Sequence, residues 1–166
     1  MSDNQTQTEI FDKNNYQISD LDSEIRVDRL CSELLKAFHQ YLLQELKLEP
    51  IDAGSQAAGA DYFLREFLIG SRQENIFDCT AKRARQFGGH WYIIRNLEPN
   101  MEELTTLLSG TAGFYQYCAH NKLISEKDAR EITRTCADLD YYRQRIEDFH
   151  AIVGDGFASW EKACPL

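Results

Sequence analysis

Apolar residues recur every three or four positions in the C-terminal part of the chain, and this period limits the fold more than any other feature. The spacing is 4-3-3-4-3-4, as expected for one face of a helix. The members are Ile132, Cys136, Leu139, Tyr142, Ile146, Phe149 and Val153. Ser125 is a suitable N-cap, and Gly154 and Gly156 end the pattern. We therefore expect a long helix over residues 125–153, followed by a docked tail over 154–166.

The same period predicts helices through the rest of the chain. Apolar spacing indicates a long helix near 20–47, a short apolar one within ADYFLREFLIG (60–70), a third over 80–96, and a fourth after the N-cap pair Asn100 and Glu103. No alternating β-pattern of useful length is present. The fold class is therefore predicted to be all-α.

Two polar stretches lack this pattern. Residues 1–18 are rich in Asn, Gln, Thr, Asp and Ser, so we expect a flexible polar tail. The stretch EPIDAGSQAAG, residues 49–59, has the composition of a linker. The remaining residues, 19–166, are expected to form a single helical domain. We find no apolar run that could cross a bilayer and no signal-peptide pattern, which predicts a cytoplasmic protein without membrane contact.

Glycines in the helix predicted over 80–96 indicate close packing. Gly88 and Gly89 each cost about 0.5 to 1 kcal/mol relative to alanine in a helix interior. The next helix carries Gly110 and Gly113 about one turn apart. We expect these two small-residue surfaces to face each other and offset the cost.

Charge is distributed unevenly along the chain, whose net charge is −9. No acidic residue occurs from Cys79 to Leu97, where basic and aromatic residues alternate. Such a segment can neutralise phosphates and stack on bases, or bind a partner. The candidate binding residues are Lys82, Arg83, Arg85, Arg95, Trp91 and Tyr92. The alternative is a helix whose arginines pair with the acidic flanking helices, and global acidity argues against nonspecific nucleic-acid binding.

Three segments carry a family resemblance. YFLREFLIG (62–70), TAKRARQFGGHWYII (80–94) and MEELTTLLSGTAGFYQYCAHNKLIS (101–125) follow each other as do helices of the SAM-like core-binding domain of tyrosine recombinases and phage integrases. The order of elements in residues 59–123 resembles that domain. The resemblance implies a SAM-like orthogonal helical bundle, here with a long helix added on each side, and DNA contact through basic helices. The recombinase catalytic domain is absent, so no catalytic residue carries over.

Other chemistry-bearing residues form no complete motif. Glu147 and His150 form one Glu-x-x-His pair, but a di-iron helical bundle needs a second pair and two further glutamates. The five cysteines include no C-x-x-C pair. Cys118 would need an approach of His90 to act as a nucleophile. We therefore expect no catalytic residue, no metal site and no cofactor.

These observations favour a non-enzymatic helical interaction module that binds a protein partner or itself through an exposed helix face. Global acidity supports a protein partner, and so do the tyrosines of the two C-terminal helices, which can form an aromatic partner surface. They are Tyr115, Tyr117, Tyr141 and Tyr142. The helix near 20–47 can also mediate a homodimer. The alternatives are a DNA-binding accessory module that uses helix 80–96, and a metal-dependent helical-bundle enzyme.

Overall fold

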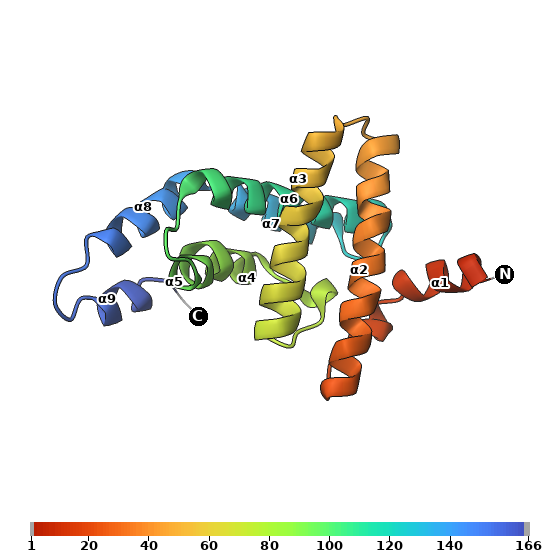
Figure 1. Cartoon of the computed structure of the whole chain (residues 1–166), viewed down its shortest axis with the longest axis horizontal. Coiled ribbons are helices and arrows are strands. Elements are labelled where there is room, and N and C mark those ends of the chain that lie inside the picture. Colours follow the sequence, from red (N-terminus) through yellow and green to blue (C-terminus); the bar gives the residue numbers. More distant parts are fainter. Residues whose placement is uncertain (1, 165–166) are drawn as a thin grey trace.

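The computed structural model describes residues 2–164, and no strand occurs among them. The all-α prediction is confirmed. The elements are α1 (Ser2–Ile10), η1 (Lys13–Tyr16), α2 (Leu21–Gln44), α3 (Pro50–Asp61), η2 (Tyr62–Ser71), η3 (Ile76–Asp78), α4 (Ala81–Gln86), η4 (Phe87–Trp91), α5 (Tyr92–Arg95), α6 (Met101–His120), α7 (Glu126–Cys136), α8 (Leu139–His150) and α9 (Phe157–Lys162). The α2–α3 hairpin stands across the other helices, and α8 and α9 extend away from it (Figure 1).

The helix predicted near 20–47 is confirmed as α2. It begins at a capping box, in which the Asp20 side chain accepts a hydrogen bond from Ser23 N at 2.8 Å and Ser23 Oγ accepts one from Asp20 N at 3.0 Å. The linker predicted over 49–59 is wrong, because these residues form most of α3. Pro50 fits the first helical turn, where no backbone N–H is needed. α3 continues without a gap into the π-helix η2.

The crossing of α3 with α6 depends on one glycine from each helix, Gly59 of α3 and Gly110 of α6. A methyl group at Gly59 would lie 2.8 Å from the backbone oxygen of Thr106, and one at Gly110 would collide with the backbone oxygen of Gln56. The two backbones are thus closer than side chains would allow. Gly113 also faces Gln56. The predicted close approach of small residues exists, but the partner of Gly110 and Gly113 is α3.

Gly88 and Gly89 have a different partner from the one predicted. They lie in η4, a π-helical turn inside the continuous helix formed by α4, η4 and α5. A methyl group at Gly88 would lie 2.7 Å from the Tyr142 ring, and one at Gly89 would lie 3.0 Å from the Tyr141 ring. These glycines therefore admit the tyrosines of α8.

The core is aromatic where the two π-helical elements meet. Phe63 and Phe67 of η2 lie 5.0 and 5.4 Å from the ring of Phe87 in η4, measured between centroids. Phe67 also lies 5.2 Å from Trp91. Buried side chains from Ile10 to Trp160 join these rings in one hydrophobic cluster.

The single helix predicted over 125–153 is wrong in its continuity. α7 ends at Cys136 and α8 begins at Leu139. The apolar period persists across this break because Leu139 and Tyr142 still face the core. Val153, the last member of the predicted stripe, lies beyond α8 and is 84% exposed. A break that keeps the helical phase leaves no trace in the spacing of apolar residues.

The flexible tail predicted over 1–18 is also wrong for the described part of that stretch. Tyr16 is fully buried, and its hydroxyl donates a hydrogen bond to the Ile10 carbonyl at 2.7 Å. The Tyr16 ring packs edge-on against Phe77 at 4.8 Å. The buried side chains of Ile10 and Tyr16 thus anchor a segment whose other residues are mostly polar.

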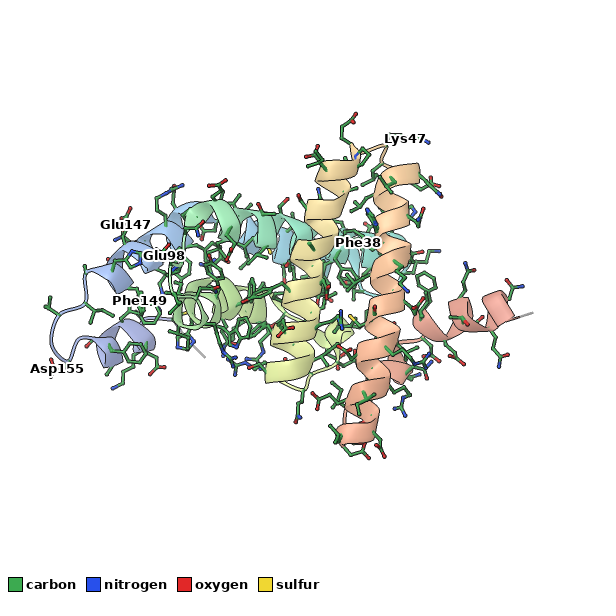
Figure 2. All side chains as sticks on the ribbon, viewed as in Figure 1. Phe38, Lys47, Glu98, Glu147, Phe149 and Asp155 are labelled. Atoms are coloured by element: carbon green, nitrogen blue, oxygen red, sulfur yellow. The ribbon has the colours of Figure 1, made fainter. Side chains whose placement is uncertain are left out.

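A docked tail is predicted over 154–166, and α9 lies within this stretch. Trp160 of α9 is buried, and its ring lies 5.0 Å from that of Phe149 in α8. Figure 2 shows Phe149 directed toward α9. Residues 165 and 166 lie outside the described part. Within residues 2–164, none of the helices has the length and apolar character needed to cross a membrane.

The α3–α6 crossing predicts opposite effects for two glycines. We expect Gly110→Ala to lower the free energy of unfolding by about 2 to 3 kcal/mol, because the methyl group meets backbone that cannot move cheaply. Gly54→Ala in α3 is the matched control, since nothing lies within 4 Å of its added methyl group. That control should gain stability by about 0.5 kcal/mol. Urea denaturation measures both, and equal effects would contradict the crossing.

Candidate functional site

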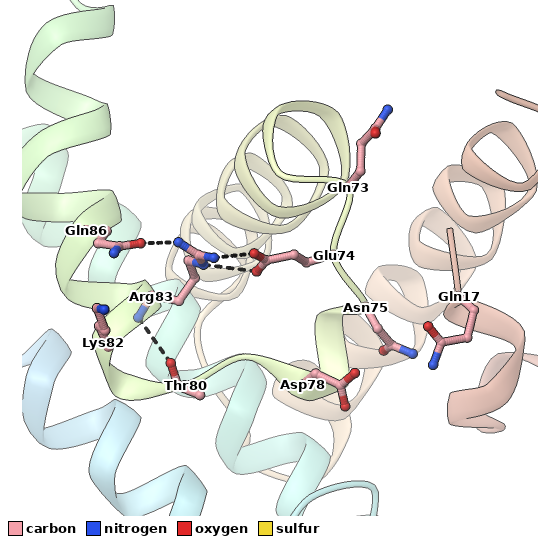
Figure 3. Close-up of a pocket in the computed structure, with 9 residues that line it drawn as sticks. All are labelled: Gln17, Gln73, Glu74, Asn75, Asp78, Thr80, Lys82, Arg83 and Gln86. Atoms are coloured by element: carbon pink, nitrogen blue, oxygen red, sulfur yellow. Dashed lines mark hydrogen bonds and ion pairs between the residues drawn. The ribbon is translucent and has the colours of Figure 1, made fainter. Parts of the chain in front are cut away.

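Arg83, at the start of the basic segment, lies in a network of side-chain contacts. Thr80 is the N-cap of α4, and its hydroxyl accepts a hydrogen bond from Arg83 N at 3.3 Å. The Arg83 guanidinium donates to both carboxylate oxygens of Glu74, with Nε 3.0 Å from Oε2, and also to Gln86 Oε1. Figure 3 shows Arg83 between these two partners. Arg83 therefore ties α4 to the connection between η2 and η3.

A polar cavity of about 470 Å³ surrounds this ion pair. Its lining also includes Lys82 and Asp78, which form no ion pair with any described residue. Gln86 and Asn75 are buried at its edge. Asn75 already donates a hydrogen bond to the Lys13 carbonyl at 3.0 Å. Within the cavity lining, the contacts of Arg83 join Glu74, Gln86 and Thr80.

Arg85 points to the opposite side of α4 and is also engaged. Its Nη2 lies 3.2 Å from Oδ2 of Asp138, in the break between α7 and α8. Its guanidinium lies over the Tyr141 ring, 4.3 Å from the centroid. The alternative expectation, that the arginines pair with acidic residues, is confirmed for Arg83 and Arg85. Their partners lie in connections between helices, however, and not in the flanking helices.

The aromatic residues of the segment are buried. Trp91 donates a hydrogen bond from Nε1 to Ser71 Oγ at 3.1 Å, and Arg95 covers its ring at 4.8 Å from the centroid. The Tyr92 hydroxyl donates to the Asn100 carbonyl at 3.2 Å. Burial raises the pKa of Tyr92 to about 12. The base-stacking role expected of Trp91 and Tyr92 is therefore wrong, because stacking needs an exposed ring face.

The six predicted residues do not form one surface. Lys82 and Arg95 are exposed, Arg83 and Arg85 turn to different neighbours, and the two aromatics are inside. Sequence reasoning missed Glu74 and Asp138, which lie 9 and 53 residues from their arginines. No local pattern connects residues at such separations.

The C-terminal segment docks on η4 through charged and aromatic groups. His90 Nε2 lies 3.0 Å from Glu161 Oε1, and the imidazole stacks on Trp160 at 5.8 Å between centroids. Arg145 is buried and donates hydrogen bonds to the carbonyls of Gly89 and Trp160 at 2.8 and 2.6 Å. The approach of His90 to Cys118 that nucleophilic catalysis would need is replaced by this contact with α9.

The residues considered for metal and thiol chemistry are dispersed. Glu147 and His150 lie on the exposed side of α8, and Figure 2 shows Glu147 directed away from the body. No group of three or more His, Cys, Asp or Glu residues within 2–164 is arranged to hold a metal ion. All five cysteines are free and buried. Burial raises the pKa of the Cys118 thiol, which disfavours the nucleophilic thiolate.

Most of the tyrosines proposed as a partner surface belong to the core. Tyr115 and Tyr142 are fully buried, and Tyr117 is 5% exposed. Tyr141 is half-buried beneath Arg85. The prediction of an aromatic partner surface on α6 and α8 is therefore wrong for Tyr115, Tyr117 and Tyr142.

An apolar groove lies on a different part of the molecule. It runs between the end of α2, the middle of α6 and the break between α7 and α8, with a volume of about 370 Å³. Its apolar lining includes Leu46, Leu48, Leu108, Ala112, Cys136 and Leu139. Leu46 is 50% exposed, and Ile51 in the first turn of α3 is 82% exposed. Large apolar side chains therefore lie unpartnered beside an apolar hollow, a combination that sequence periodicity does not reveal.

The Arg83–Glu74 pair predicts a salt-dependent loss of stability. We expect Arg83→Met to lower the free energy of unfolding by about 1 kcal/mol, because a bidentate, partly buried pair is removed. Lys82→Met, next to it and without an ion pair, should change stability by less than about 0.3 kcal/mol. Denaturant titration at low and molar salt tests this, and the difference should shrink as salt screens the pair. Equal losses in the two variants would contradict it.

The buried thiols predict slow modification of the native protein. Burial raises the pKa of Cys79 and of Cys136 to about 12, and raises the pKa of Cys31 and Cys118 as well. We expect an aromatic disulfide reagent at mildly alkaline pH to react at least about a hundredfold more slowly with the native than with the unfolded chain. A fast native phase would identify an accessible thiolate and contradict this.

The chain was compared with known protein families and with solved structures. No protein-family model matches the chain, and no solved structure matches it. The resemblance of residues 59–123 to the recombinase core-binding domain accordingly stays a prediction.

Proposed function

We propose that this chain is a non-catalytic helical interaction module that binds protein through the apolar groove. One observation carries the proposal: Leu46, 50% exposed, lines a hollow of about 370 Å³ with a mainly apolar lining, and Ile51, 82% exposed, lies on the same end of the α2–α3 hairpin. Exposed apolar groups beside a concave apolar surface are characteristic of protein-binding sites. The contact surface is the apolar groove with the adjoining end of the α2–α3 hairpin.

The floor of the groove supports recognition of a helix. Leu108 and Ala112 belong to α6 and lie about one turn apart, and Gly113 follows Ala112. The small side chain of Ala112 leaves room for an apolar side chain of a partner. A helix that presents apolar residues at the same spacing can lie in such a groove.

The DNA-binding alternative has less support from the contacts. Nonspecific affinity for DNA depends on cations that are free to neutralise phosphates. Arg83 and Arg85 are already paired with Glu74 and Asp138. Lys82 and Arg95 are exposed but lie at opposite ends of the segment. The DNA-binding module, like the metal-dependent enzyme, stays a prediction without a specific observation in its favour.

Selection from a displayed library of amphipathic helices tests the proposal. We expect selected helices to shift amide resonances of groove residues such as Leu108 and Ala112, as measured by NMR. Leu46→Glu should weaken their binding at least about tenfold, because a charge then enters the apolar contact. Leu97→Glu is the matched control, since Leu97 is fully exposed on the α5–α6 connection. Binding that maps elsewhere, or that survives Leu46→Glu, would contradict the proposal.

A further inference from the structure

We infer that the occupant of the apolar groove is a second copy of this chain, related by a two-fold axis. The inference rests on the proposed function and names its partner. Two walls of opposite charge flank the groove on one molecule. Such a surface complements itself when it is rotated onto a copy.

The first wall is the end of the α2–α3 hairpin, and it is acidic. Glu45, Glu49 and Asp52 are all exposed, and none forms an ion pair with a residue in 2–164. Lys47 is the only basic residue between them. Figure 1 shows this end projecting beyond the neighbouring helices, and Figure 2 labels Lys47 there. The acidic groups are therefore presented on a protruding element.

The second wall is the edge of α7 beside the groove, where Arg130 and Arg134 lie with one acid, Glu126; the exposed Asp128 and Glu131 lie farther around the helix. Arg130 and Arg134 lie one turn apart, three residues before Thr133 and Ala137 respectively, and both of these line the groove. Arg134 forms no ion pair with any described residue. Arg130 lies 3.8 Å from Glu126, with both side chains largely exposed, so this pair contributes little. Both guanidinium groups are available to a partner.

A two-fold axis that runs along the groove, between its walls, brings unlike walls together. The acidic hairpin end of one copy then meets the basic α7 of the other, and the reverse contact follows by symmetry. A foreign helix of uniform charge would be repelled by one of the two walls. The presence of both signs on one patch therefore favours a second copy over a simply basic or acidic partner.

The apolar groups have complementary shapes in the same arrangement. Leu46 and Ile51 are exposed on the protruding hairpin end, and Leu46 also lines the hollow, whose lining is mainly apolar. Each copy thus supplies both the inserted side chains and the receiving groove. An isologous interface needs this combination, because the same patch serves on both subunits.

Two charge-reversed variants test the inference when they are studied alone and mixed. They are Glu45→Lys/Glu49→Lys and Arg130→Glu/Arg134→Glu. Sedimentation velocity over micromolar to millimolar concentrations should show a dimer of the unaltered chain. Each variant alone should dimerise at least about tenfold more weakly, because like charges then meet twice. The mixture should regain an affinity within about threefold of the unaltered chain, because both contacts in the mixed dimer are again between opposite charges.

Control variants separate this result from misfolding. Ile51→Glu should weaken the dimer, whereas Leu97→Glu should not, and circular dichroism melts should match for all variants. An unaltered chain that remains monomeric, or a mixture that associates no better than its components, overturns the second copy as occupant. Binding of selected helices to that monomer would still uphold the proposed function. Failure in both experiments would remove the groove as an interaction site.

Discussion

The crossing of α3 and α6 is the constraint on which the rest of the arrangement depends. Their backbones meet where Gly59 and Gly110 leave no room for a side chain. Because α2 is joined to α3 by a short connection, this crossing also fixes the position of the hairpin relative to α6. The groove lies between the same elements, and Gly113 places its floor against Gln56. The shape of the proposed binding surface therefore follows from the tightest packing in the core.

A second close contact joins the π-helical turn η4 to α8. η4 opens the helix at Gly88 and Gly89, where the tyrosines of α8 enter. The free carbonyl of Gly89 then accepts a hydrogen bond from Arg145, and buried polar groups need such partners. Irregular helical turns often occur at functional sites. Here Gly88 and Gly89 instead pack against Tyr142, Tyr141 and Cys164. The glycine pair that most distinguishes the basic segment thus has a structural explanation.

Sequence reasoning predicted what depends on local period and capping. The extent of α2, the helix over 80–96 and the start of α6 at Asn100 follow from apolar spacing and N-cap residues. It failed where tertiary contacts override composition. Residues 49–59 look like a linker because the alanines and glycines of a close helix crossing resemble those of a flexible segment. The break after Cys136 keeps the helical phase, and Tyr16 anchors a stretch that is otherwise polar. Of the candidate site, the basic segment and the pairing of its arginines with acidic residues were predictable, but the partners Glu74 and Asp138 were not.

The lack of acidic residues between Cys79 and Leu97 is explained by pairing across the chain. Glu74 and Asp138 lie outside the segment, yet they bind its arginines and hold α4 against two connections. Within this basic segment, Arg83 and Arg85 cross-link elements, since they meet their counter-charges only after folding. The apolar groove differs from the basic segment, because the sequence does not reveal it and only the fold does. Its residues are unremarkable along the sequence, and they become unusual only because the fold leaves Leu46 and Ile51 without a partner. An interaction surface in this chain is therefore better sought among groups that folding leaves unsatisfied than among groups that composition makes conspicuous.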